Sequence, residues 1–158
     1  METILQSAAK VRFQDCDPFN HLYSTRYLDY FLNAREDQVL AAYDLNVFKD
    51  MESIGSVWVI TGTQIGYLKP ALMGETVIIE SQLIAFTPRT LTVEMRMWNE
   101  TRQVLKSIMW TTFTYIYLQT QRPALHPEHL SQLFQKIHLP VEQKDFEERK
   151  THLIRQNR

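Results

Sequence analysis

The sequence has few of the features that mark several large classes of protein. A single cysteine, Cys16, excludes an intrachain disulfide and is typical of a reducing, cytoplasmic location. The 17 Lys and Arg residues are balanced by 18 Asp and Glu residues, so no basic field attracts nucleic acid. No apolar run approaches the roughly 20 residues that span a bilayer, and the N-terminus lacks the pattern of a signal peptide. We therefore expect a soluble, cytoplasmic protein that binds neither nucleic acid nor membrane.

The hydrophobic pattern changes from strand to helix near the N-terminus. Residues 8–14 alternate between apolar and polar side chains, which predicts a short strand with one solvated face. Acidic residues and Pro18 then end that strand. From Ser24 onward apolar residues recur at helical spacing, which predicts a central buried helix of about 20 residues that ends near residues 43–46. Ser24 or Thr25 is the expected N-cap.

The middle of the chain carries four strand signals, and the C-terminal part is helical again. The predicted strands lie in residues 56–69, 75–86, 90–98 and 103–118. A second helix begins at Pro127, and we interpret the neighbouring histidines of "HPEH" as surface residues without a metal. We assign residues 1–139 to one domain. Residues 140–158 form a charged helical tail whose few apolar residues would bury little, so it either frays or docks on a partner subunit.

This order of elements favours an α+β fold. The short connectors between the strands suit antiparallel hairpins better than parallel crossover units. One curved antiparallel sheet wrapped around the long helix, with a C-terminal helical extension, buries that helix most economically.

Three motifs resemble those of one known family. "DCDPFNHLYSTRY" (15–27) resembles the opening motif of hotdog-fold acyl-CoA thioesterases of the 4-hydroxybenzoyl-CoA thioesterase type, which reads roughly D-x-D-x-x-G-H-[VL]-x-N-x-x-Y. "IGYLKPALMGETV" (65–77) is similar to the family's Y-x-x-P-x-x-x-G-[DE] turn between two strands. "QRPALHPEHL" (121–130) is similar to its exit from the last strand into a helix. The resemblance covers most of residues 8–135 and implies a hotdog fold and acyl-CoA hydrolysis.

The chain departs from the family pattern at several positions. Asn20 stands where many relatives have glycine, and Tyr23-Ser24 stands where one branch has two asparagines. No glutamate lies near Leu32 or Asn33, where relatives often have one in the helix. These departures affect the choice of substrate more than the class of reaction.

The resemblance implies a role for each of five residues. Asp17 corresponds to the family's catalytic carboxylate, acting as nucleophile or general base on the thioester. An N–H group near Tyr23 or Ser24, at the helix N-terminus, would bind the oxyanion. His21 would orient the substrate carbonyl or hold the loop, and Tyr27 would line the acyl pocket or pack in the core. The family's site is shared between subunits, which implies a homodimer or homotetramer, and no metal or other cofactor is implied.

Simpler interpretations stay open beside these roles. Asp17 also fits an Asp-Pro turn, and Asp15 is expected to be structural. Cys16 lies between two carboxylates that disfavour a thiolate, which argues against a cysteine hydrolase. The scattered cations that would hold the CoA phosphates are Lys69, Arg89, Arg96, Arg102 and Lys106. The alternative functions are an acyl-CoA-binding protein without hydrolysis and, less favoured, a hydratase or dehydratase on the same fold.

Overall fold

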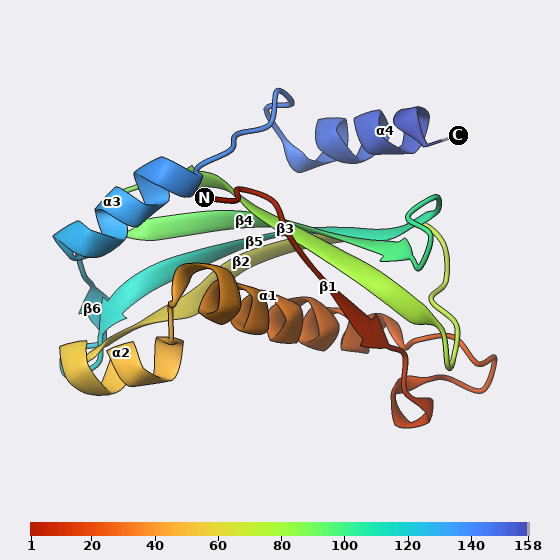
Figure 1. Ribbon diagram of the computed structural model, residues 1–158, viewed down its shortest axis with the longest axis horizontal. Helices are drawn as coiled ribbons and strands as arrows, with labels where there is room; N and C mark the ends of the chain where they lie inside the picture. Colours follow the sequence, from red (N-terminus) through yellow and green to blue (C-terminus); the bar gives the residue numbers. More distant parts are fainter. Residues whose placement is uncertain (158) are drawn as a thin grey trace.

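A six-stranded antiparallel sheet with helices on both of its faces organises the computed structural model, which describes residues 1–157 (Figure 1). The strands are β1 (Leu5–Lys10), β2 (Ser56–Tyr67), β3 (Thr76–Phe86), β4 (Thr90–Asn99), β5 (Leu105–Tyr117) and β6 (Arg122–Pro123). The helices are α1 (Tyr27–Tyr43), α2 (Val47–Ile54), α3 (Glu128–Ile137) and α4 (Phe146–Gln156), with 3-10 turns η1 (Phe13–Asp15) and η2 (Ser24–Arg26). No helix in this part of the chain is both long and apolar enough to cross a bilayer.

The sheet has the order β1-β3-β4-β5-β2, and β6 pairs with β5. All pairings are antiparallel, as the short connectors predict. β5 lies inside the sheet, as its long apolar sequence indicates, whereas β1 and β2 form the edges. The predicted α+β fold, a curved antiparallel sheet around a long helix, is confirmed.

Helix α1 packs on the inner face of the sheet along one stripe. Its buried residues recur every three or four positions from Tyr27 through Phe31 and Ala34 to Gln38, and Val39 lies beside the last of them. They meet the inward side chains of β3, β4 and β5 in one apolar core. Gln38 is the polar member of the stripe, and its amide donates to the carbonyl of Ile79 at 3.0 Å. The helix is not buried all round, because Leu40 on its second half is 44% exposed.

The charged tail docks on the chain's own sheet. Helix α4 lies across the face opposite α1 (Figure 1), where Phe146 and Leu153 pack against Trp98, Leu105 and Ile108. The expectation that the tail buries little and frays or docks on a partner is therefore wrong. Its few apolar residues fall on one face of the helix, and that face fits an apolar patch of the outer sheet surface.

Two boundaries near the N-terminus differ from the prediction. The first strand ends at Lys10, and Phe13 is 81% exposed in η1, because the Arg12 N–H donates to Tyr30 Oη at 3.0 Å rather than to a strand. The long helix begins at Tyr27 after the tight turn η2, and neither Ser24 nor Thr25 caps it through its side chain. Its end at Tyr43 is as predicted, with the next residue in the left-handed region.

Helix α2 was not predicted from the sequence, and His126 was predicted to lie on the surface. The Asn46 side chain caps α2 by accepting from the N–H groups of Phe48 and Lys49, and Gly55 (φ 79°) ends it. That cap and glycine are the sequence signals that mark so short a helix. His126, expected on the surface, is 7% exposed, because its ring packs among Trp58, Tyr115 and Phe134.

Candidate active site

The loop before α1 brings the predicted site residues to one hollow. Asp17, His21, Tyr23, Ser24 and Tyr27 all line a cavity of about 420 Å³ at the N-terminal end of the helix. Four residues from the end of β2 and the turn after it complete the wall: Tyr67, Leu68, Lys69 and Pro70. Residues from the first two motifs thus meet in space, although about 40 positions separate them in the chain.

Asp17 uses one carboxylate oxygen to shape the loop. Its Oδ1 accepts from the N–H groups of Phe19 at 2.8 Å and His21 at 3.1 Å, so the turn-forming interpretation describes this atom. Oδ2 has no hydrogen-bond partner among the residues described and remains available to a ligand. Asn20 adopts φ 64°, which explains why relatives have glycine at this position and why asparagine serves here.

The two predicted oxyanion donors differ in availability. The Tyr23 N–H donates to the Asp15 carbonyl at 2.9 Å and is occupied. The Ser24 N–H is the first of the turn η2 and has no acceptor within residues 1–157. Of the two N–H groups, only that of Ser24 is without an acceptor among the described residues, and Ser24 lines the cavity.

Tyr27 serves as both core and cavity wall. Its hydroxyl accepts from the Ala71 N–H at 3.1 Å, and its ring meets Tyr67 edge to face at 5.1 Å. Burial raises the pKa of Tyr27, so its phenol stays neutral. The Tyr67 hydroxyl donates to the Ser24 carbonyl at 2.8 Å and fixes the start of the helix. Sequence reasoning did not assign Tyr67 a role, although it is the tyrosine of the Y-x-x-P motif.

Asp15 and Cys16 behave as structural residues. The Tyr30 hydroxyl donates to Asp15 Oδ2 at 2.6 Å, which ties the loop to α1. Burial and this bond raise the pKa of Tyr30 to about 12. Burial and then the charges of Asp15 and Asp17 raise the pKa of Cys16, which keeps the thiol protonated. The cysteine therefore lacks the chemistry of a nucleophile.

Lys69 is the predicted CoA-phosphate cation that lies beside Asp17, since both line the same cavity. Arg96 is buried in an ion pair with Glu80 of β3, Lys106 in one with Glu75 of the turn before β3, and Arg102 also pairs with Glu80. These three are structural, and only a part of the predicted set stays available for a ligand. Residues 1–157 contain no cluster of His, Cys, Asp and Glu that fits a metal ion.

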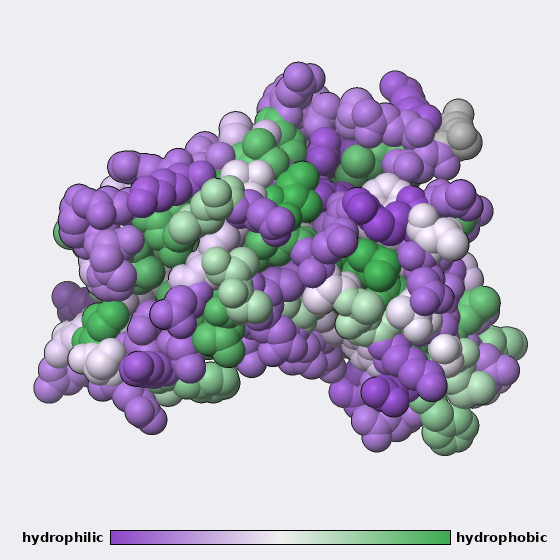
Figure 2. Space-filling view, in the orientation of Figure 1, coloured by the Kyte–Doolittle hydropathy of each residue, from purple (hydrophilic) through white to green (hydrophobic). Residues whose placement is uncertain are grey.

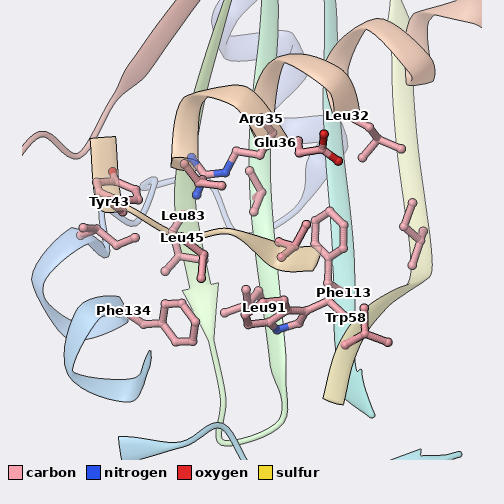
Figure 3. A pocket seen from close by; sticks show the side chains of 16 residues that line it. Leu32, Arg35, Glu36, Tyr43, Leu45, Trp58, Leu83, Leu91, Phe113 and Phe134 are labelled. Carbon is pink, nitrogen blue, oxygen red and sulfur yellow. The ribbon is translucent and has the colours of Figure 1, made fainter. Parts of the chain in front are cut away.

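A second, apolar hollow lies farther along α1. It has a volume of about 270 Å³ and is enclosed by the second half of α1, the inner sheet face and α3 (Figure 3). Leu83, Leu91, Phe113 and Phe134 point into it, and Trp58 of β2 forms part of its wall. In one protomer it is separate from the polar cavity, since no residue lines both and their nearest α1 residues, Tyr27 and Leu32, lie about 7.5 Å apart along the helix axis.

Solved structures share this architecture at low sequence identity. A DHNA-CoA thioesterase from Staphylococcus aureus superposes with a TM-score of 0.78 and 18% identity, over 85% of this chain and 90% of that one. The hypothetical protein SAV2348 from Staphylococcus aureus, solved in complex with CoA, gives 0.80 and 16%, over 92% of each chain. YbaW, a probable thioesterase from Escherichia coli, gives 0.72 and 23%, over 85% of this chain and 99% of that one. These likenesses establish the hotdog fold.

No curated protein matches the sequence. A family profile, however, matches residues 11–134 and is described as the thioesterase-like superfamily. The match includes the loop of Asp17, the long helix, the whole sheet from β2 to β6 and most of α3. It confirms the predicted class of thioester hydrolase, while the narrower 4-hydroxybenzoyl-CoA type stays a resemblance. The chain belongs to the thioesterase-like superfamily, whose profile spans most of its length.

Proposed function

We propose that the protein hydrolyses an acyl-CoA thioester to the free acid and CoA, with Asp17 as its catalytic carboxylate at a subunit interface. The observation that carries this proposal is the pairing of the available Asp17 Oδ2 with the open Ser24 N–H in one cavity. Hydrolysis needs a carboxylate and a donor on the developing oxyanion, and Asp17 and Ser24 both line this cavity.

In the proposed reaction each group has a distinct role. The thioester carbonyl oxygen accepts from the Ser24 N–H, where the helix N-terminus favours negative charge. Asp17 then either attacks the carbonyl carbon, so that CoA leaves as the thiolate and water hydrolyses the resulting acyl-aspartyl anhydride, or removes a proton from a water that attacks the carbonyl carbon and displaces the thiolate. His21 lines the cavity and positions the loop through its main chain, since its N–H and carbonyl bond Asp17 Oδ1 and the Asp17 N–H.

CoA would enter beside Lys69. This lysine is exposed and lies on the cavity wall, so its ammonium group reaches the phosphates without a desolvation cost. The neighbour solved in complex with CoA has the same fold over most of its length, which supports a CoA ligand for this chain.

The interface proposal rests on the free edge of β2. This 12-residue strand is exposed from Val59 to Gln64, and an exposed edge of that length is a template for pairing with another strand. Antiparallel pairing of two copies about a two-fold axis near Gly62 would place the start of β2 beside the partner's end of β2. The apolar hollow includes the start of the strand and the polar cavity its end. Each apolar hollow would then adjoin the Asp17 loop of the other copy.

The test is thiol release from short, medium, long-chain and aromatic acyl-CoAs by the wild type and Asp17→Asn. We expect Asp17→Asn to lower the rate by at least about 100-fold while circular dichroism and molecular mass stay unchanged. Asp37→Asn, an exposed site on α1, is the matched control and should keep full activity. Unchanged activity in Asp17→Asn would remove Asp17 from the site. After a single turnover in ¹⁸O-water, label in the Asp17 carboxylate identifies Asp17 as the nucleophile, since water has then opened the anhydride at the aspartyl carbonyl.

An acyl-CoA-binding protein without hydrolysis is the second candidate. The observation that favours it is α1 itself, where Leu32 and Asn33 occupy the positions at which relatives often have a glutamate. Tight binding of acyl-CoA by the wild type with no thiol release across the whole panel would select this function instead.

A further inference from the structure

The apolar hollow contains a cation that the proposed hydrolysis does not use. Arg35 of α1 lies on its wall, and Figure 3 shows the guanidinium on the side of the cavity formed by Tyr43 and Leu83. The other polar groups of the wall are engaged elsewhere or face solvent. The Tyr43 hydroxyl donates to the Glu2 carbonyl, the Trp58 indole N–H donates to His126, and Glu36 is exposed. Arg35 is the only cation among the lining residues.

The guanidinium of Arg35 has spare donors. Its Nη1 donates to Ser81 Oγ at 2.9 Å, and Ser81 in turn donates to Gln38. Within residues 1–157 no carboxylate oxygen lies within 4.0 Å of a guanidinium nitrogen of Arg35, so this arginine forms no ion pair there. Burial without a carboxylate lowers the pKa of Arg35 to about 10, so the group is still charged at neutral pH. A charge partly removed from water and not paired is costly unless a ligand pairs with it.

We propose that the apolar hollow selects acyl chains that end in a carboxylate, and that Arg35 binds this distal carboxylate. A guanidinium presents a planar fork of donors that matches a carboxylate with two parallel hydrogen bonds. The methylene segment of the chain would lie against the leucine and phenylalanine side chains. The hollow, with a volume of about 270 Å³, has room for an acyl chain of several carbons, so six- and eight-carbon acyl groups are suitable probes. This inference rests on the proposed function, because it names the acyl group that Asp17 would release.

A structural role for Arg35 is the competing explanation, since its bond to Ser81 links α1 to β3. The two explanations differ in what they predict for neutral substrates. A structural arginine affects every acyl group alike, whereas a recognition arginine affects only those with a distal carboxylate. The test must therefore compare substrates that differ at the far end alone.

The experiment measures kcat and KM for adipoyl-CoA against hexanoyl-CoA and for suberoyl-CoA against octanoyl-CoA. We expect the wild type to prefer the carboxylated member of each pair by at least tenfold in kcat/KM. Arg35→Met should remove that preference through a higher KM, while the neutral substrates are hydrolysed as before or better. Arg35→Lys should keep part of the preference for carboxylated substrates, since lysine has the positive charge but lacks the paired donors of the guanidinium group. Lys136→Met, an exposed cation of α3, should keep the wild-type preference.

The outcomes separate this inference from the proposed function. A wild type that hydrolyses neutral acyl-CoAs without preferring carboxylated ones overturns the role of Arg35 and leaves hydrolysis intact. Equal losses on both members of each pair in Arg35→Met indicate the structural role. If the wild type hydrolyses no thioester, the proposed function fails. Calorimetric binding of intact adipoyl-CoA and hexanoyl-CoA to the wild type and Arg35→Met then decides the inference alone.

Discussion

The two faces of the sheet are both covered by a helix, yet they differ in the charges that they bury. On the inner face, under α1, the buried residues of the central strands are mostly apolar, with only small polar residues among them: Ile79, Leu83, Val93, Met95, Met97 and Met109, with Ser81, Ser107 and Thr111. On the outer face, under and around α4, charged residues are buried beside an apolar patch: Glu80, Glu94 and Arg96, with Trp98, Leu105 and Ile108. Figure 2 shows charged and polar residues over the region of α4, with apolar groups in smaller patches. The inner face is thus held by packing, whereas the outer face adds paired charges to its packing.

The outer face holds α4 through a closed set of partners. Glu94 is fully buried and accepts from Arg149 of α4 at 2.8 and 2.9 Å and from the Trp110 indole at 2.8 Å. It also pairs with Arg96, which donates to Glu80 at 2.9 and 3.0 Å. Because each charge needs its partner, the network admits one position of α4, whereas an apolar face tolerates sliding. The inner face instead leaves room for hollows along α1, and the candidate site uses them.

Glu94→Ala should break the outer face and give the largest effect. Removing this carboxylate leaves Arg96 and Arg149 without their shared partner in a buried place, which costs about 3–5 kcal/mol of unfolding free energy. Urea unfolding followed by circular dichroism measures the loss. Glu147→Ala, on the exposed side of α4 and paired only with Lys150, is the control and should change stability by about 1 kcal/mol or less. Equal effects of the two variants would mean that α4 does not close the network in solution.

Met95→Ala tests the inner face at the neighbouring residue of the same strand. Met95 is fully buried on the side of α1, and its truncation removes apolar contacts and leaves a cavity, which costs about 2–5 kcal/mol. Met95→Leu, which nearly conserves volume, is the matched control and should cost less than about 1.5 kcal/mol. If Met95→Ala lowers the free energy of unfolding as little as Met95→Leu does, α1 has moved to fill the cavity left by the truncation.

The inner face was predictable from the sequence and the outer face was not, for a physical reason. Alternation of Val93, Met95 and Met97 with polar residues marks the inner side of β4 without further information. The same alternation assigns Glu94 and Arg96 to solvent, and their burial depends on partners elsewhere in the chain, Arg149 for Glu94 and Glu80 for Arg96. No local pattern reports a partner that lies 55 residues away.

The candidate site was likewise predictable where its residues are neighbours in the sequence and not where they come from distant segments. The motif at residues 15–27 predicted the residues that meet in the polar cavity, because they belong to one loop. Two features needed coordinates: the occupied N–H of Tyr23, and the contribution of Tyr67 from β2. Arg35 gave no signal at all, since an arginine on a helix is usually solvated.

The two faces should also differ in the pH at which each loses stability. On the outer face, ionisation of Glu94 determines this pH. Burial alone would raise the pKa of Glu94, but its bonds to Arg149 and its pairing with Arg96 outweigh burial and hold the pKa below 4.5. A depressed carboxyl pKa stabilises the fold above the unfolded value, and the contribution is lost as pH falls through the folded value. Glu94→Gln should therefore be less stable than the wild type at pH 7, with the gap closing below pH 4.5. A gap of constant size down to pH 3 would contradict the ion network.

On the inner face, protonation of His126 determines the pH at which stability is lost. We expect this change in the free energy of unfolding to be the smallest of those predicted. The Trp58 indole N–H donates to His126 Nε2 at 3.0 Å, so this nitrogen must be unprotonated, and burial lowers the pKa of His126 below 6.5. The unfolded chain binds the proton first as pH falls, so the contribution is complete above 6.5 and is lost toward the folded pKa. Stability should rise with pH in that window, by at most about 1.4 kcal/mol per pH unit for one proton.

His126→Gln tests this assignment with little change in packing. Glutamine offers Trp58 an amide oxygen and does not titrate, so the slope of stability against pH just below 6.5 should flatten, while the loss below pH 4.5 from Glu94 persists. His129→Gln, an exposed site on α3, should keep the wild-type slope. Chemical denaturation at half-unit steps from pH 4 to 8, with tryptophan fluorescence as the signal, separates the two windows. If the slope of stability against pH is unchanged in His126→Gln, another group titrates in this window, and His126 does not make the stability of the inner face depend on pH.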